Sequence, residues 1–186
     1  MLNWDQIGEN VLKNKLEFYE LIQKRLKGGD VLRYHTRPEV ADKQDVAAHS
    51  WRSLVLLTTL WPDASKNSIL FVLYHDVAEL EIGDVPATTK WKYKDLAKTL
   101  TVIENDYEDL LCLPVKYADL SEEEQQRVKI VDILELVFHC HKQMQKGNSL
   151  ASDIFYRGID FLYSNFKYSK DYVLIETVLE KMKGEP

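Results

Sequence analysis

The chain has 186 residues, of which 45% are hydrophobic and 29% charged, and its net charge is −6. This length predicts one domain, residues 1–186, with a core of its own. The negative charge argues against a nucleic-acid polymer as partner, because such proteins carry a basic face, but it does not exclude a small phosphate ligand. The two cysteines, Cys112 and Cys140, form no CxxC pair, so we expect reduced thiols in a cytoplasmic protein. No apolar run approaches the roughly 20 residues of a membrane span, and the first residues lack the apolar core of a signal sequence.

Apolar residues recur at helical spacing almost throughout, which predicts an all-α fold. The first helix is expected from Trp4 to Lys27. Residues 30–46 show no period and form a loop. A second helix is expected over Ala47 to Leu60, and a third begins after a Ser65 cap and continues to about Ile82.

The second half of the chain continues in the same way. A proline-containing loop at 84–90 precedes a fourth helix that ends at about Leu111. Ser121 and Glu124 fit a capping box, which opens a helix that runs to about Lys146. Two C-terminal helices are expected at 149–166 and 170–183, and their aromatic residues belong either to the core or to a subunit interface.

Three polar residues lie together in the apolar stretch "YHDVAEL": His75, Asp76 and Glu79. Burying an unpaired charge is costly. Either a metal ion compensates these groups, or the histidine is a core residue paired with a neighbouring carboxylate. Within one continuous helix Glu79 would project on the same side as the other two.

Two further helices each offer a polar group from an apolar context. His49 lies in the first turn of the second helix, where it is either a ligand or a partly buried cap. Asp132 lies in "VKIVDILELVF" and is either a ligand or the partner of a Lys or Arg. Two imidazoles and two carboxylates suit a divalent transition ion (Zn, Mn, Co, Fe or Ni) and leave room for water and substrate. We interpret His139 and His141 as structural, because their side chains diverge across the helix axis.

The order H…HD…D, with an acid just after the HD pair, resembles the HD-domain metal-dependent phosphohydrolases. The block "YHDVAELEIGDVPATTK" is similar to the HD-x-x-E…GD-x-P…K block of bacterial 5′-deoxynucleotidases. "AAHSW" resembles the segment around their first His, and "LRYHTRP" the Arg–aromatic pair upstream. Small phage HD proteins, among them dATP triphosphohydrolases, share this layout. The resemblance covers about residues 30–135, and it implies an HD-domain helical bundle that forms a homo-oligomer, located in the host cytoplasm if phage-encoded.

Carried over position by position, the resemblance assigns roles to twelve residues. The metal ligands would be His49, His75, Asp76 and Asp132. The catalytic residues would be Glu79, as the acid, and Asp76, which also orients the nucleophile. The substrate-binding residues would be Arg33, Tyr34, Asp84, Val85, Pro86, Ala87 and Lys90. Tyr34 stands where the bacterial enzymes have Trp, which leaves the nucleobase preference open.

The implied activity is hydrolysis of the 5′-phosphate or triphosphate of 2′-deoxynucleotides, with dATP and dAMP favoured. It uses a transition metal, with a second Mg as a further option. The alternatives are a strict 5′-deoxynucleotidase for monophosphates and a nucleotide-binding module without turnover. Glu79 has a second possible role in holding the tautomer of His75, Tyr34 in covering the core, and Lys90 in a loop salt bridge. The lysines at 90, 92, 94 and 98 suit either a polyphosphate tail or a solvated helix face.

Overall fold

The computed structural model describes the backbone of residues 15–184 and most of the side chains between them. The predicted all-α fold is confirmed. The helices are α2 (Lys15–Gly29), α3 (Val46–Leu60), α4 (Lys66–Tyr74), α5 (Glu79–Ile82), α6 (Ala87–Lys92), α7 (Lys94–Leu110), α8 (Glu122–Gln145), α9 (Ser152–Phe166) and α10 (Tyr172–Lys183). The part of the first predicted helix that precedes Lys15 lies outside the described residues. None of the helices described is long and apolar enough to cross a membrane.

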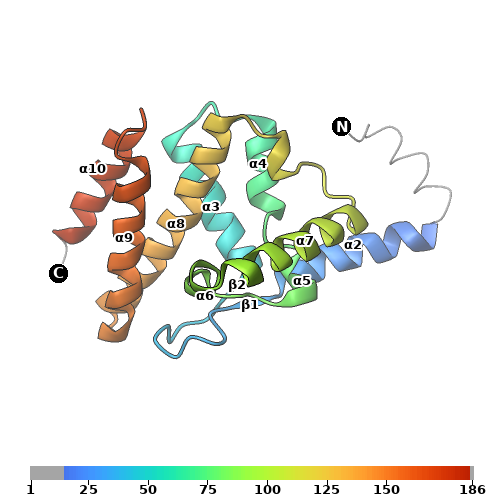
Figure 1. Cartoon of the computed structure of the whole chain (residues 1–186), viewed down its shortest axis with the longest axis horizontal. Coiled ribbons are helices and arrows are strands. Elements are labelled where there is room, and N and C mark those ends of the chain that lie inside the picture. The colour runs from blue at the N-terminus through green and yellow to red at the C-terminus, as the bar shows by residue number, and fades with distance from the viewer. Residues whose placement is uncertain (1–14, 185–186) are drawn as a thin grey trace.

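The long helix α8 is the centre of the molecule, with α9 and α10 on one side of it and α3 and α4 on the other (Figure 1). The main core lies where these helices meet, and its most deeply buried members include Leu57, Ile130, Leu134, Leu162, Ile175 and Leu179. Most of the C-terminal aromatic segment belongs to this core through Phe155 and Phe166, whereas Tyr156 and Tyr168 are exposed. Helices α2, α5 and α7 form a second group beside α4 (Figure 1).

Two predicted helix starts are confirmed by their caps. Ser65 accepts a hydrogen bond from the backbone N–H of Ser68 at 3.1 Å. Ser121 and Glu124 form the reciprocal capping box, since each side chain accepts the other residue's backbone N–H, at 3.3 and 2.8 Å. These bonds satisfy N–H groups that have no partner inside the helix.

The third predicted helix is not continuous to Ile82, and that prediction was wrong. Helix α4 ends at Tyr74, residues 75–78 form a turn, and the short α5 begins at Glu79. Within the turn the backbone N–H of Val77 donates to Tyr74 O, three residues back, at 3.0 Å. The bend directs the Val77 side chain toward Leu111 and Leu113, with which it forms a small second apolar cluster. This packing outweighs the helical spacing of the apolar residues in the sequence.

Two predicted loops also contain short regular elements. Within residues 30–46 the two-residue strands β1 (Leu32–Arg33) and β2 (Gln44–Asp45) pair antiparallel, with Arg33 opposite Gln44. The loop expected at 84–90 is shorter, because α6 begins at Ala87. The β1–β2 ladder leads directly into α3, whose N-cap is Asp45.

Candidate active site

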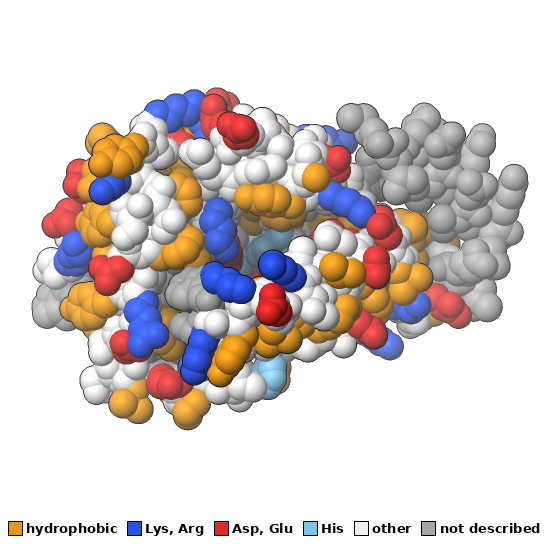
Figure 2. Space-filling view, in the orientation of Figure 1, with side chains coloured by type: hydrophobic (Ala, Val, Ile, Leu, Met, Phe, Trp, Pro, Cys, Tyr) orange, Lys and Arg blue, Asp and Glu red, His pale blue; other side chains and the backbone are white. Residues whose placement is uncertain are grey.

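A hollow opens near the middle of the face shown in Figure 2, bordered by Lys and Arg side chains. Its volume is about 370 Å³, within the range of small-molecule sites. The loop after β1, the turn after α4, and helices α6, α8 and α9 contribute to its wall. The predicted site residues that line it are Arg33, Tyr34, Asp76, Glu79, Asp84, Val85, Pro86, Lys90 and Asp132. Ala87 begins α6 beside them, and its side chain lies outside those described.

The four expected metal ligands lie together at one side of this cavity. The two Nε2 atoms of His49 and His75 are 3.2 Å apart. Asp132 Oδ1 lies 3.5 Å from His49 Nε2, and these three residues form a group that could hold a metal ion. The Asp76 oxygens lie 3.5 Å from His49 Nε2 and 3.4 Å from His75 Nε2. Helix α3, the turn that follows α4, and helix α8 thus bring together donors from distant parts of the sequence, of which His49 and Asp132 are 83 residues apart.

The other ring nitrogen of each histidine is held by an acceptor. His49 Nδ1 lies 2.8 Å from Glu135 Oε2, and His75 Nδ1 lies 2.9 Å from Val72 O. A carbonyl and a carboxylate can only accept, so each Nδ1 carries a hydrogen. Burial keeps His75 neutral by lowering its pKa, whereas for His49 the carboxylates of Asp132, Glu135 and Asp76 outweigh burial and raise the pKa. In its neutral form each ring turns an Nε2 lone pair toward the other. Two Nε2 atoms 3.2 Å apart, among carboxylates that raise the pKa of His49, mark a place that favours a cation, and so the residues present fit a metal ion.

The carboxylates of the group are ionised in spite of their burial. Burial alone would raise the pKa of Asp132, but Lys129, whose Nζ is 2.9 Å away, and His49 hold it well below its ordinary value. Burial likewise acts to raise the pKa of Asp76, but His75 and Arg33 outweigh it, and the pKa is lowered. The two interpretations of Asp132, as a metal ligand and as the partner of a basic residue, are therefore compatible. Asp132 pairs with Lys129 and also lies among the candidate ligands.

Glu79 is the opposite case. Its side chain is buried, and burial, followed by the charge of Asp76, raises its pKa to about 9. Its Oε2 has no hydrogen-bond partner among the described residues. A carboxyl group that is protonated at neutral pH can act as a proton donor. The alternative role, holding the tautomer of His75, is filled by the Val72 carbonyl.

Arg33 and Tyr34 lie side by side at the wall of the cavity, with the Arg33 guanidinium 5.5 Å from the centroid of the Tyr34 ring. The Arg33 guanidinium bonds to the Asp76 carboxylate. Tyr34 has a positive φ of 60°, an unfavourable region for a bulky residue, and its N–H donates to Asp84 Oδ2 at 2.7 Å. Its ring stacks on His139 with centroids 5.3 Å apart. Asp84 thus stabilises the backbone that presents Tyr34, and Tyr34 both covers the core and lines the cavity.

Of the lysines at 90, 92, 94 and 98, only Lys90 is among the cavity residues, and it also pairs with Glu104 at 2.9 Å. Lys92 and Lys94 belong to a separate shallow surface, and Lys98 is largely exposed beside Asp95. The other cations of the cavity are Arg37, Lys129 and Arg157, which sequence reasoning missed. Arg157 comes from α9, beyond the segment that carries the resemblance.

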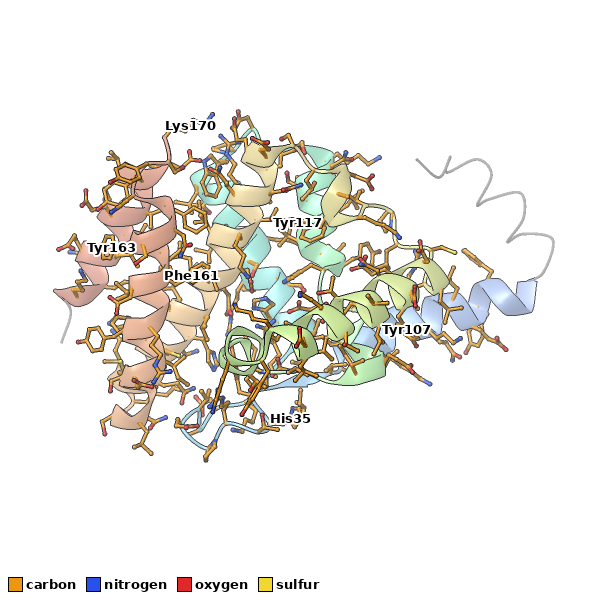
Figure 3. The ribbon with its side chains drawn as sticks, viewed as in Figure 1. His35, Tyr107, Tyr117, Phe161, Tyr163 and Lys170 are labelled. Carbon is orange, nitrogen blue, oxygen red and sulfur yellow. The ribbon has the colours of Figure 1, made fainter. Side chains whose placement is uncertain are left out.

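Glu135 was also missed, although the signal was present. It follows Asp132 by three residues in the same apolar run, and it is 1% exposed. The remaining histidines lie outside the donor group. His139 and His141 pack against aromatic rings, as expected of structural residues. His35, labelled in Figure 3, is exposed in the loop after β1, where its ring bonds to Leu32 O.

Comparison with known proteins shows which family has this sequence and which solved structures share this fold. The family model described as "5′-deoxynucleotidase YfbR-like" matches residues 31–159. An HD-domain phosphohydrolase of Listeria innocua has the same fold, with a TM-score of 0.73, 18% identity, and 90% of each chain covered. The cyanophage S-2L HD phosphohydrolase DatZ, solved with dA and one catalytic Zn²⁺, has a TM-score of 0.67 and 19% identity over 88% of this chain and 96% of that one. A search among curated proteins found no match. The family model spans more than two thirds of the sequence and includes every candidate site residue, so the chain belongs to the YfbR-like family of 5′-deoxynucleotidases.

Proposed function

We propose that this protein hydrolyses the bond between the α-phosphorus and the 5′-oxygen of 2′-deoxynucleotides and releases the deoxynucleoside. The observation that carries the proposal is the convergence of two histidines and two ionised carboxylates at the wall of a cavity that also contains a neutral, buried Glu79. A module that only binds nucleotides would have no need of this proton donor.

His49, His75, Asp76 and Asp132 would hold a divalent transition ion, as the mixed N/O set favours. When bound, such an ion acidifies a water molecule and polarises a phosphoryl oxygen. The Zn²⁺ and dA in the phage neighbour support this assignment.

The remaining chemistry belongs to the side chains of the cavity. Asp76 orients the attacking water. Glu79, with its raised pKa, donates a proton to the leaving 5′-oxygen, which would otherwise depart as an alkoxide. Lys129 and Lys90 supply positive charge for the phosphate. Arg33, held against Asp76, crowds the space that a 2′-OH would fill, while Tyr34 and the segment from Asp84 to Pro86 enclose the sugar and base.

The 5′-monophosphate is the favoured substrate, because the matching family is one of 5′-deoxynucleotidases. A deoxynucleoside triphosphate, dATP first, is the second candidate. Arg37 and Arg157 add positive charge to the cavity beyond what one phosphate needs. Both substrates are cleaved at the same bond, so the catalytic residues alone do not separate them.

The test is chromatography of reactions that contain metal-free protein, added Mn²⁺ or Co²⁺, and one nucleotide each: dAMP, dATP or AMP. We expect deoxyadenosine and phosphate from dAMP, and much slower turnover of AMP. Deoxyadenosine that appears together with triphosphate from dATP, at a comparable or higher rate, would establish the second candidate. Binding of dAMP without product would instead identify a nucleotide-binding module.

A further inference from the structure

Glu135 is a buried carboxylate that does not line the cavity, yet it contacts the candidate metal site. It is 1% exposed on α8, and both of its oxygens are occupied. Oε2 lies 2.8 Å from His49 Nδ1, and Oε1 accepts from Gln44 Nε2 at 2.8 Å. The Arg52 guanidinium lies 3.6 Å from Oε1. Burying a charged carboxylate costs free energy unless the charge is paired. The partners of Glu135 offset this cost, and the contact with His49 points to a role at the candidate metal site.

The contact with His49 decides which ring nitrogen is available. With its Nδ1 hydrogen directed at a carboxylate, His49 presents the lone pair of Nε2 to the donor group. His75 is oriented by a neutral carbonyl, whereas His49 is oriented by a charged group, which increases the electron density at Nε2. The contact with Glu135 therefore holds the His49 ring from the side opposite the donor group.

The contact with Gln44 connects the same carboxylate to the wall that carries Arg33. Gln44 lies in β2 directly opposite Arg33 in β1. It is 5% exposed, and its amide bonds across to α8. The Arg33 side chain in turn reaches Asp76, whose oxygen is 3.5 Å from His49 Nε2. The five residues form a closed ring of contacts around the candidate site.

We propose that Glu135 and Gln44 are positioning residues: Glu135 holds His49 ready to bind the metal ion, and through Gln44 it also fixes the strand that presents Arg33 to the substrate. This inference rests on the proposed function for its substrate half, while its metal half can be measured without turnover.

The metal half is tested by titrating Co²⁺ into the metal-free protein in competition with a chelator. Glu135→Gln keeps the size and shape of the side chain and removes its charge. We expect its affinity for Co²⁺ to fall by about 10–100-fold, the usual effect of losing such a partner. Wild-type affinity in a folded Glu135→Gln protein would overturn this half. A lost Co²⁺ affinity in a protein that hydrolyses no nucleotide would refute the proposed function and leave the positioning role of Glu135 standing.

The substrate half is tested by Gln44→Met, which keeps the length and removes the donor. We expect KM for dAMP to rise several-fold while kcat changes little, since Arg33 is displaced but the metal ligands remain. Gln143→Met is the matched control, because Gln143 is also buried and also joins this loop to α8, through Asp42 N at 3.2 Å. Equal effects of the two substitutions on KM would overturn the role of Gln44. Should Glu135→Gln fail to fold, this comparison still decides the link between the strand and Glu135.

Discussion

At the scale of single residues, the site separates its acids by environment. Asp76 and Asp132 are surrounded by Arg33, Lys129 and two imidazoles, and they remain ionised. Glu79 lies three residues after Asp76, but its burial and the nearby charge of Asp76 outweigh the positive charge of Arg33, and it is kept neutral. Carboxyl groups of opposite protonation state in one cavity are what a reaction with an ionic nucleophile and a basic leaving group requires.

Glu79→Gln tests the acid role directly. The amide keeps the shape of the carboxyl group and cannot release a proton, so we expect kcat for dAMP to fall by about 10²-fold or more, the usual contribution of a general acid. Bound metal, measured by elemental analysis, should be unchanged, because Glu79 is outside the donor group. Activity within a few-fold of wild type would show that another group donates the proton.

The same variant has a defined pH signature in the metal-free protein. The folded-state pKa of Glu79, about 9, is raised above the ordinary value of 4.5. Between these values the folded state holds a proton that the unfolded state has lost, so the free energy of unfolding decreases as pH rises from about 4.5 to 9. Urea unfolding at pH 5 and pH 8.5 should show this loss in wild type and less of it in Glu79→Gln. Glu81→Gln, on the exposed side of α5, is the control and should retain the wild-type slope.

The candidate metal ligands were found in the sequence because each stands out as a polar residue in an apolar stretch, and the structure brings them together. The same reasoning applied to Glu135 would have found it, but its partner His49 comes from a helix 86 residues away, and only folding shows that the two meet. Arg37 and Arg157 look like ordinary surface residues in the sequence. Their place at the cavity follows from the packing of the loop and α9 against α8.

At the scale of elements, the turn at residues 75–78 connects α4 to α5 and carries part of the site. Asp76 lies in this turn, and Val77 beside it packs under the end of α2. Gly28, in the last turn of α2, leaves room for that contact. A Cβ atom added at Gly28 would lie 2.5 Å from Val77 Cγ1 and 2.9 Å from Val77 O.

Gly28→Ala therefore sets two effects against each other. Alanine is the better helix former by about 1 kcal/mol, but the clash involves a backbone oxygen that cannot move cheaply, and overpacking costs about 1–3 kcal/mol. We expect the clash to prevail and the urea midpoint to fall. Gly184→Ala is the control, since its nearest neighbour would be 3.6 Å away, and its midpoint should not fall. A Gly28→Ala midpoint at or above that of wild type would contradict the close packing of α2 on the turn.

The sequence predicted the helices whose starts carry caps, such as α4 at Ser65 and α8 at Ser121, because capping is local chemistry. It did not predict the break at His75. The apolar spacing through residues 66–82 fits one helix, and the bend is imposed by contacts of Val77 with α2 and with Leu111, which are distant in sequence. The β1–β2 ladder was missed because two paired residues leave no period to detect.

At the scale of the whole molecule, the candidate metal site joins helices that otherwise meet through the apolar core. His49 belongs to α3, His75 caps the end of α4, Asp76 lies in the following turn, and Asp132 belongs to α8. An ion that binds only when these helices are assembled stabilises the entire fold.

Metal binding should therefore be visible in thermal unfolding. At a free ion concentration about 100 times Kd, the folded state gains about 2.7 kcal/mol. A domain of this size gains roughly 2–4 °C per kcal/mol, so Tm should rise by roughly 5–10 °C when Co²⁺, Mn²⁺ or Zn²⁺ is added to the metal-free protein. Mg²⁺, which prefers oxygen ligands, should give a smaller shift.

The variant His75→Ala should abolish the rise in Tm. His141→Ala should lower the starting Tm, because His141 packs on Phe155 in the core, but it should retain the shift. An equal rise in Tm for wild type and His75→Ala would place the ion elsewhere and remove His75 from the ligand set.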